Sequence, residues 1–261
     1  MKKRGSFKIV RAVLFALIIR EVRGRFGANR LGAFWFIFEP LAHITVLLTI
    51  FSLVRGQMNY GPPLPMFLAT GIIPFLLFKN IVLKGMEAVA ANKALFAYRQ
   101  IKPIDTILAR TIVESVLMAC VYMAIIFALG FWGGYDVAIH FPLKWGMMML
   151  IGIMLSLGLA LIFCTIGEAM PELKGFIKIL FMPLYFISCV ILPVWVLPLR
   201  MREWIWWNPF LHLIDGIREA TFLHYPQVNG VRASYPAAIA VVVLFLGIVL
   251  YRLRREQLVA I

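Results

Sequence analysis

Three side chains that can bind metal follow one face of a predicted helix near the C-terminal end of the sequence. His212, Asp215 and Glu219 are spaced i, i+3 and i+7, which places them along one side of an α-helix. Arg218 lies beside them, so the carboxylates already have a local charge partner. The pattern favours a polar stripe at the surface or at a subunit interface, and we predict no metal in this chain.

A second polar pair, Glu39 and His43, is spaced i, i+4 in an apolar run. The pair could relay protons, but a polar lining for a cytoplasmic vestibule, or a bond to a neighbouring helix, is the favoured interpretation. An unpaired carboxylate in a bilayer costs about 3 kcal/mol. We therefore expect Glu39, Glu114 and Glu168 to face protein or water.

Motifs of common enzymes are absent from the sequence. It contains no GxxxxGK[ST] phosphate loop, no GxSxG nucleophile elbow and no HExxH zinc pair. Cys120, Cys164 and Cys189 fall in apolar runs without a metal ligand nearby, which is typical of small hydrophobic residues rather than of a disulfide set. We predict a chain that is not an enzyme and holds no cofactor.

The composition is that of an integral membrane protein. Of the 261 residues 62% are hydrophobic and 15% are charged, and the mean hydropathy is +0.91. A membrane-spanning helix needs about 20 apolar residues. Six runs approach this length, which predicts an all-α fold with six transmembrane helices at about 33–54, 64–83, 107–132, 145–167, 176–194 and 235–251.

The distribution of Lys and Arg predicts the orientation. With both termini in the cytoplasm, the inside segments carry 20 of the 26 basic residues, as the positive-inside rule requires. The net charge of +14 then indicates attraction to anionic lipid or an anionic substrate rather than nucleic acid.

Two segments outside the spans have amphipathic character. Within residues 1–32, charges at Lys8, Arg11, Arg20 and Arg23 alternate with apolar residues, which predicts an interfacial helix on the cytoplasmic leaflet. The loop 84–106 mixes charge with aliphatic and aromatic residues, and Pro103 should separate one short helix from the next. Such anchors favour a docking surface for a cytoplasmic partner.

The segment 195–234 precedes the last span and should lie outside. Pro193 and Pro198 interrupt any continuous helix, and several Trp residues suit a membrane interface. Asn208 is a good N-cap and Pro209 a good first residue for an amphipathic helix over 208–222. A half-inserted helix at the mouth of a pore is one explanation for this pattern.

Three stretches carry a family resemblance. RFGANRLGAFWFIFEPLAHI (25–44), ANKALFAYRQIKPIDTILAR (91–110) and NPFLHLIDGIREATFLHY (208–225) occur in this order along the chain. Together with the six runs they resemble ABC type-2 exporter permeases, and more narrowly capsular polysaccharide export permeases. The resemblance covers nearly the whole chain, which then forms a single transmembrane domain over 1–261 in the bacterial inner membrane.

The resemblance implies partners that the chain lacks within itself. Such permeases are homodimers with two separate ATP-binding subunits, which hold the ATP and Mg²⁺, and periplasmic or outer-membrane export components are expected. The segment 84–106 would contact the ATP-binding subunits, and 195–234 would be re-entrant. The coupling residues would be Asn92, Leu95, Phe96, Tyr98, Arg99, Lys102 and Asp105, and the re-entrant segment would present Trp207, Asn208, His212, Asp215, Arg218 and Glu219.

The implied substrate is a lipid-linked, usually acidic polysaccharide. Arginine pairs bidentately with carboxylate and phosphate, and aromatic rings offer stacking surfaces for sugars. The expected substrate path comprises Arg20, Arg23, Arg25, Arg30, Trp35, Phe36, Glu39, His43, Tyr185 and Phe186.

Two alternatives remain open from sequence. The first is a type-2 exporter for another substrate, such as O-antigen, teichoic acid or a drug. The second is a membrane enzyme acting on lipid-linked sugars, with Glu39 and His43, or His212, Asp215 and Glu219, as acid and base. The two sets fall on opposite sides of the membrane and lack an obvious nucleophile, which disfavours the enzyme.

Overall fold

The computed structural model describes residues 6–27, 32–55, 61–98, 100–228 and 230–259, and all regular secondary structure in these ranges is helical. The elements are α1 (Ser6–Gly27), α2 (Gly32–Arg55), α3 (Leu64–Met86), η1 (Ala90–Ala97), α4 (Pro103–Phe131), α5 (Pro142–Ala169), α6 (Leu173–Ile187), η2 (Val194–Val196), α7 (Leu199–Ile205), α8 (Pro209–Thr221) and α9 (Ser234–Val259).

Four helices of the described chain, α3, α4, α5 and α9, are long and apolar enough to cross a membrane. They confirm helices at four of the predicted runs. α3 is the central helix, since 83% of its most apolar window is buried and it contacts α2, α4, α5, α6 and α8. A helix that is apolar all round is expected at such a position.

The other two predicted runs are also helical, at least in part. The run 33–54 lies within α2. The predicted run 176–194 is too long, because α6 ends at Ile187. Its 15 residues extend about 22 Å, less than the hydrocarbon thickness of about 30 Å. The chain leaves the helix in a turn where Cys189 has φ 53°, and Pro193 follows.

Glycines permit a close contact between α5 and α9. A Cβ on Gly158 would lie 2.7 Å from the backbone nitrogen of Leu244, and one on Gly247 would lie 2.8 Å from the carbonyl oxygen of Gly158. Small residues at such crossings let two helix backbones approach, which is how helices associate in lipid. The pair fixes α9 against the bundle.

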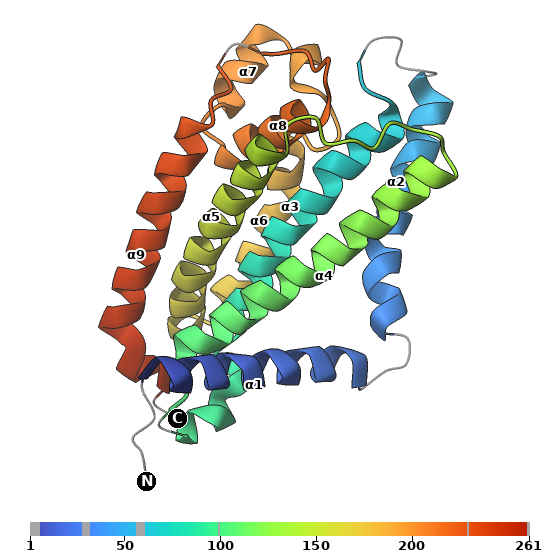
Figure 1. Cartoon of the computed structure of the whole chain (residues 1–261). Helices are drawn as coiled ribbons and strands as arrows, with labels where there is room; N and C mark the ends of the chain where they lie inside the picture. The colour runs from blue at the N-terminus through green and yellow to red at the C-terminus, as the bar shows by residue number, and fades with distance from the viewer. Residues whose placement is uncertain (1–5, 28–31, 56–60, 99, 229, 260–261) are drawn as a thin grey trace.

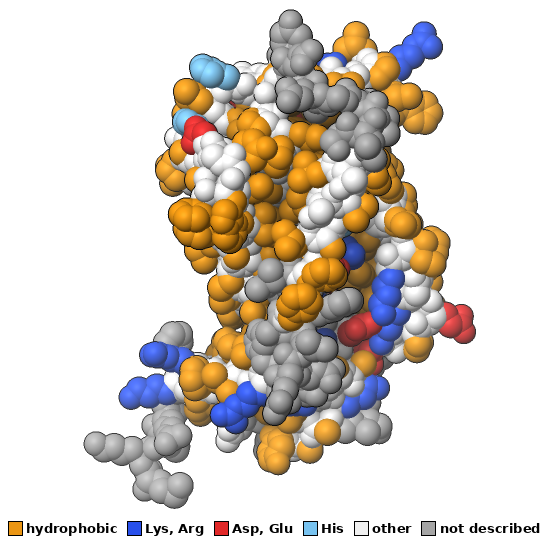
Figure 2. All heavy atoms as spheres, turned by 90° about the vertical axis from the view of Figure 1, so that its right-hand side faces the viewer, with side chains coloured by type: hydrophobic (Ala, Val, Ile, Leu, Met, Phe, Trp, Pro, Cys, Tyr) orange, Lys and Arg blue, Asp and Glu red, His pale blue; other side chains and the backbone are white. Residues whose placement is uncertain are grey.

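The two ends of the molecule differ (Figure 1). α1 lies across one end, roughly perpendicular to the bundle, with η1 and the C-terminal part of α9 beside it; α7 and α8 lie at the opposite end. We call these the α1 end and the α8 end. Figure 2 shows an apolar middle zone, with most Lys and Arg side chains of that face gathered at the α1 end. Such zoning is expected of a membrane protein with a basic cytoplasmic side.

Candidate functional site

The predicted coupling segment forms the short helix η1 and contacts α1. The side-chain oxygen of Asn92 accepts a hydrogen bond from the Arg20 guanidinium at 2.6 Å, while its amide donates to the carbonyl of Ala88 at 2.7 Å. Asn92 is buried. Arg20, expected in the substrate path, therefore joins α1 to the coupling segment.

The expected coupling side chains divide into inward and outward groups. Phe96 packs in a core cluster with Ile107, Leu161 and Tyr251, so its ring faces the chain's own interior. Tyr98 is 66% exposed, which makes it the aromatic side chain presented at this surface.

The remaining coupling residues have different environments. Leu95 is half-buried and Lys102 is exposed. Asp105 is buried, and its carboxylate accepts a hydrogen bond from the backbone N–H of Lys102 at 3.0 Å. It thereby caps the N-terminus of α4, which Pro103 opens as predicted. Arg99 lies outside the described residues.

A buried ion cluster fastens α1 to the bundle. The carboxylate of Glu114 in α4 is fully buried and pairs with Arg25 of α1 and with Lys84 of α3, the latter at 2.8 Å. Arg110 reaches the carbonyl oxygen of Lys84 at 2.7 Å. Glu114 thus faces protein, as expected for a carboxylate in an apolar run.

Glu21 of α1 extends this cluster. Its carboxylate pairs with Arg25 at 3.0 Å and with Arg110 at 3.3 Å. Burial raises the pKa of Glu21, but the two guanidiniums together outweigh burial and hold that pKa below its ordinary value. Glu21 is therefore ionised at neutral pH and links α1 to α4.

The arginines expected to receive substrate are thus placed unequally. Arg20 and Arg25 contact other parts of the chain, whereas Arg23 is exposed on α1. Arg30 lies outside the described residues. Arg23 alone of the described three presents its charge to the surroundings without these internal bonds.

Ion pairs also connect the coupling segment to α5 and α6. Glu168, at the end of α5, pairs with Lys93 of η1 at 3.4 Å and with Lys174 of α6 at 2.6 Å. Glu87, just before η1, pairs with Lys178 of α6 at 2.5 Å. A displacement of η1 would therefore act on α6 through two contacts.

Two residues of the expected substrate path meet between α2 and α6. The hydroxyl of Tyr185 lies 3.0 Å from Nε2 of His43, within hydrogen-bond distance. Phe186 is 61% exposed, and Glu39 is also exposed. The side chains of Trp35 and Phe36 lie outside the described residues. The structure thus brings together His43 and Tyr185, from distant parts of the sequence.

The helix predicted over 208–222 is present as α8, with the expected cap. The side chain of Asn208 accepts a hydrogen bond from the N–H of Phe210 at 3.0 Å, and Pro209 is the first helical residue. The prediction that the polar face of this helix lies at the surface or at a subunit interface is wrong, because His212, Asp215 and Arg218 are buried inside the same chain. Trp207, just before the cap, is exposed.

The three potential metal ligands have separate partners. His212 donates from Nε2 to the carbonyl of Trp206 at 2.9 Å, Asp215 accepts from the Tyr225 hydroxyl at 2.5 Å, and Glu219 pairs with Lys144 at 2.6 Å. The described residues contain no group of three side chains suited to a metal ion. The ion partner of Glu219 is Lys144 and not Arg218, contrary to the sequence expectation.

Arg218 instead binds backbone carbonyls. Its guanidinium donates to Cys189 at 2.8 Å, Val190 at 2.6 Å and Phe67 at 3.1 Å, and its Cζ lies 3.5 Å from the centre of the Phe67 ring. A Cβ on Gly71 would lie 2.2 Å from Nη2, so Gly71 supplies the space. Arg218 holds α8, α3 and the turn after α6 together.

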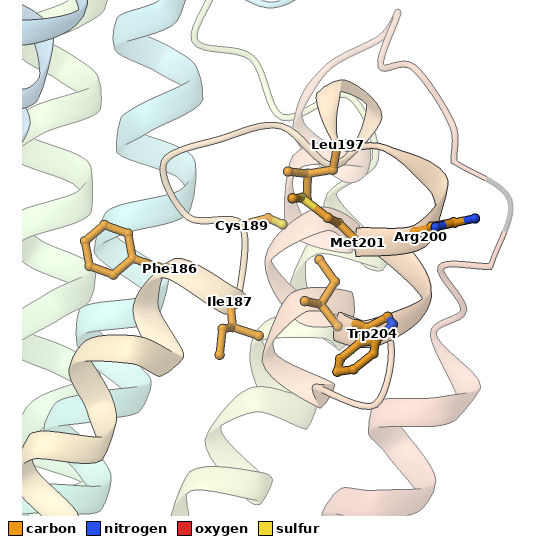
Figure 3. Close-up of a pocket in the computed structure, with 8 residues that line it drawn as sticks. Phe186, Ile187, Cys189, Leu197, Arg200, Met201 and Trp204 are labelled. Carbon is orange, nitrogen blue, oxygen red and sulfur yellow. The ribbon is translucent and has the colours of Figure 1, made fainter.

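A pocket of about 460 Å³ lies between the end of α6 and α7. Figure 3 shows Cys189, Leu197 and Met201 close together, while Phe186 points away and Arg200 points outward. The turn fixed by Arg218 thus forms part of this pocket's wall. Its apolar lining, with a single arginine at the edge, suits an amphiphile or lipid.

Sequence reasoning misses most of the charged contacts at the α1 end. No local pattern singles out Lys84, Glu87, Lys93, Arg110 or Lys178. The i,i+4 spacing of Glu21 and Arg25 indicates that pair, but not the contact of Glu21 with Arg110. A carboxylate in an apolar run does indicate Glu114 and Glu168, but their partners lie on other helices and no local spacing identifies them.

Comparison with known proteins is consistent with this architecture. The sequence pattern of the ABC-2 type transporter family matches residues 12–222. The polysialic acid transport protein KpsM of Escherichia coli is 38% identical over 258 residues, which are 98% of each chain. The capsule polysaccharide export inner-membrane protein CtrC of Neisseria meningitidis serogroup B is 26% identical over 226 residues, 83% of this chain and 82% of the relative. The O-antigen export system permease protein RfbA of Myxococcus xanthus is 24% identical over 254 residues, 95% of this chain and 94% of the relative.

With four apolar helices long enough to span a membrane and a family match over most of its length, this chain belongs to the ABC-2 type transporter family.

Proposed function

We propose that this protein is the membrane permease of an ATP-driven exporter that moves lipid-linked capsular polysaccharide across the bacterial inner membrane. This proposal rests on the 38% identity to a polysialic acid transport protein across 98% of both chains. The capsule export relatives named as inner-membrane proteins support the same location and substrate class. ATP and Mg²⁺ would be bound by separate subunits.

The contacts of η1 support a role for this segment in coupling. It bonds to α1 through Arg20 and to α5 through Lys93, while the adjoining Glu87 bonds to α6. An ATP-binding subunit docked on η1 would therefore pull on three helices at once. α6 carries Tyr185 and the exposed Phe186, which we place beside the translocation path between two copies of the chain.

We further propose that α2 and α6 complete a set of six membrane segments, with the α1 end in the cytoplasm. α7 and α8 would then form a re-entrant pair that closes the outer end of the path. The concentration of Lys and Arg at the α1 end supports this orientation. Export components outside the inner membrane would receive the polysaccharide at the α8 end.

Tyr98→Ala tests the docking surface. We expect the amount of ATP-binding subunit that co-purifies with the permease to fall about tenfold, or about 1.4 kcal/mol, because an exposed aromatic anchor is lost. Trp132→Ala is the matched control, since Trp132 is 79% exposed at the end of α4 distant from η1. An equal loss of the ATP-binding subunit in both variants, or no loss in Tyr98→Ala, would show that η1 is not the docking segment.

Cysteine labelling tests the orientation. In a variant without Cys120, Cys164 and Cys189, Glu203→Cys in α7 should react with a membrane-impermeant thiol reagent added from the periplasmic side. Lys93→Cys in η1 should react only after the membrane is opened. Both native side chains are exposed, so accessibility is not limited by burial. The reverse pattern would overturn the orientation.

An O-antigen exporter is the second candidate, supported by the 24% identity to an O-antigen export permease over 95% of this chain. The two are separated by which glycan accumulates inside cells that lack this permease. Accumulated capsular polysaccharide supports the first proposal, and accumulated O-antigen supports the second.

A further inference from the structure

A groove of about 1110 Å³ lies at the coupling segment, between the end of η1 with the residues that follow it and the C-terminal part of α9. Phe96, Ile101 and Ile248 contribute apolar walls, and Lys102, Arg252 and Arg255 contribute positive charge. It is more than twice as large as the pocket between α6 and α7, whose lining has one cationic side chain. The proposed coupling role of η1 does not depend on this groove.

The wall formed by α9 changes from apolar to cationic within two turns. Ile248, Tyr251, Arg252 and Arg255 all line the groove, and their spacing of three, four and seven residues places them on one face of the helix. At 1.5 Å per residue, Ile248 and Arg255 are about 10 Å apart along the axis. The order of the lining matches an amphiphile, with its tail toward the bundle and its anionic group toward the helix end.

The positive groups of this groove are available to a ligand. Neither Lys102 nor Arg252 forms an ion pair with another residue that the structure describes, and the contact of Arg255 with Glu256 is long, at 3.9 Å. The groove lining thus has three cationic side chains and one carboxylate, that of Glu256. Guanidinium groups pair well with phosphate, so charge complementarity requires an anion.

We infer that this groove binds an anionic phospholipid of the membrane, with the phosphate held by Arg252 and Arg255 and an acyl chain against Ile248 and Ile101. A lipid is favoured over an acidic segment of a soluble subunit because Ile248 belongs to the apolar spanning part of α9, which lipid reaches directly. Phe96 and Lys102 belong to the coupling region, so the bound lipid would brace that region against α9.

Photo-crosslinking tests this inference on the permease purified with its ATP-binding subunit, in phosphatidylcholine nanodiscs. The probe is phosphatidylglycerol with a photoactivatable acyl chain, and crosslinked peptides are identified by mass spectrometry. We expect crosslinks within 96–104 and 248–256. Arg252→Gln/Arg255→Gln should reduce them about tenfold, and Arg11→Gln/Arg254→Gln, which removes equal charge at exposed positions outside the groove, should leave them within twofold.

Four results would overturn the inference. They are equal labelling by a phosphatidylcholine probe, unchanged labelling in Arg252→Gln/Arg255→Gln, displacement of the lipid by soluble glycerol 3-phosphate, and loss of the ATP-binding subunit from that variant with labelling retained. The third would indicate a free-phosphate site and the fourth a protein-docking site. Because both arginines are exposed, the variant should fold normally, which thermal unfolding of the purified complex checks.

Discussion

Replacing Arg218 with methionine is expected to lower the free energy of unfolding by about 3 kcal/mol and to abolish export. The substitution leaves the carbonyls of Cys189 and Val190 without their charged donor in a buried site. It also releases the turn after α6 from α8. Thermal unfolding of the purified permease measures the first effect, and capsule at the cell surface measures the second.

Gly71→Ala should cause the same loss of stability and export although Arg218 itself is unchanged. The added Cβ would lie 2.2 Å from Nη2 of Arg218, so the guanidinium must move. Gly146→Ala is the matched control, because a Cβ there meets nothing within 4 Å, and alanine should leave helix stability unchanged or slightly raised.

The thiol of Cys189 reports whether the turn is released. Cys189 is 3% exposed, so in a variant that lacks Cys120 and Cys164 it should react slowly with a maleimide. Reaction should be at least about tenfold faster in Arg218→Met and in Gly71→Ala, because local opening exposes the turn. Slow reaction and normal export in both variants would show that Arg218 does not hold this end of α6.

Replacing Glu114 with glutamine is expected to destabilise the contact between α1 and the helix bundle. Arg25 and Lys84 would then share a buried site without their carboxylate, which costs about 3–5 kcal/mol when one partner of a buried pair is removed. We expect α1 to loosen and ATP hydrolysis by the assembled exporter to continue without export. Capsule at the cell surface and the ATPase rate of the purified complex are the two measurements.

Glu172→Gln provides the control for Glu114→Gln, since Glu172 is exposed at the same end of the molecule. The double variant Glu114→Gln/Arg25→Gln separates pairing from packing. If Glu114 and Arg25 act through each other, the double variant should be less destabilised than the sum of the single variants. Additive losses, with export still coupled to hydrolysis, would contradict the proposed role of the cluster.

Local features of this fold could be predicted from sequence. The start of α8 needs only Asn208 and Pro209, and the start of α4 only Pro103, because caps and first-turn prolines act on their own helix. The runs that form α3, α4, α5 and α9 are predictable because lipid imposes a length on spanning helices.

The end of α6 could not be predicted in this way. Its apolar run continues past Ile187, and hydropathy does not register a turn. That turn is held by Arg218, which lies 28 and 29 residues further along the chain. Since the partner is remote, neither the turn nor the site that stabilises it is visible in the local pattern.

The polar residues of α8 show the same limit. His212, Asp215 and Arg218 form a stripe that favours exposure, but Trp206, Tyr225 and the turn after α6 cover it. Periodicity identifies the two faces of a helix, whereas the environment of each face depends on elements elsewhere in the chain. For Glu114, sequence predicts a protein environment but not Arg25 or Lys84.

The proposed export function can be measured as transport in inverted inner-membrane vesicles that contain this chain and the ATP-binding protein that co-purifies with it. Lipid-linked capsular polysaccharide, isolated from cells lacking the permease, is added outside and its uptake is measured. We predict uptake that requires ATP, stops with a non-hydrolysable ATP analogue and is absent without the permease. A chain that purifies and crosslinks without an ATP-binding partner, or vesicles that hydrolyse ATP without any uptake of this polysaccharide, would contradict the proposed function.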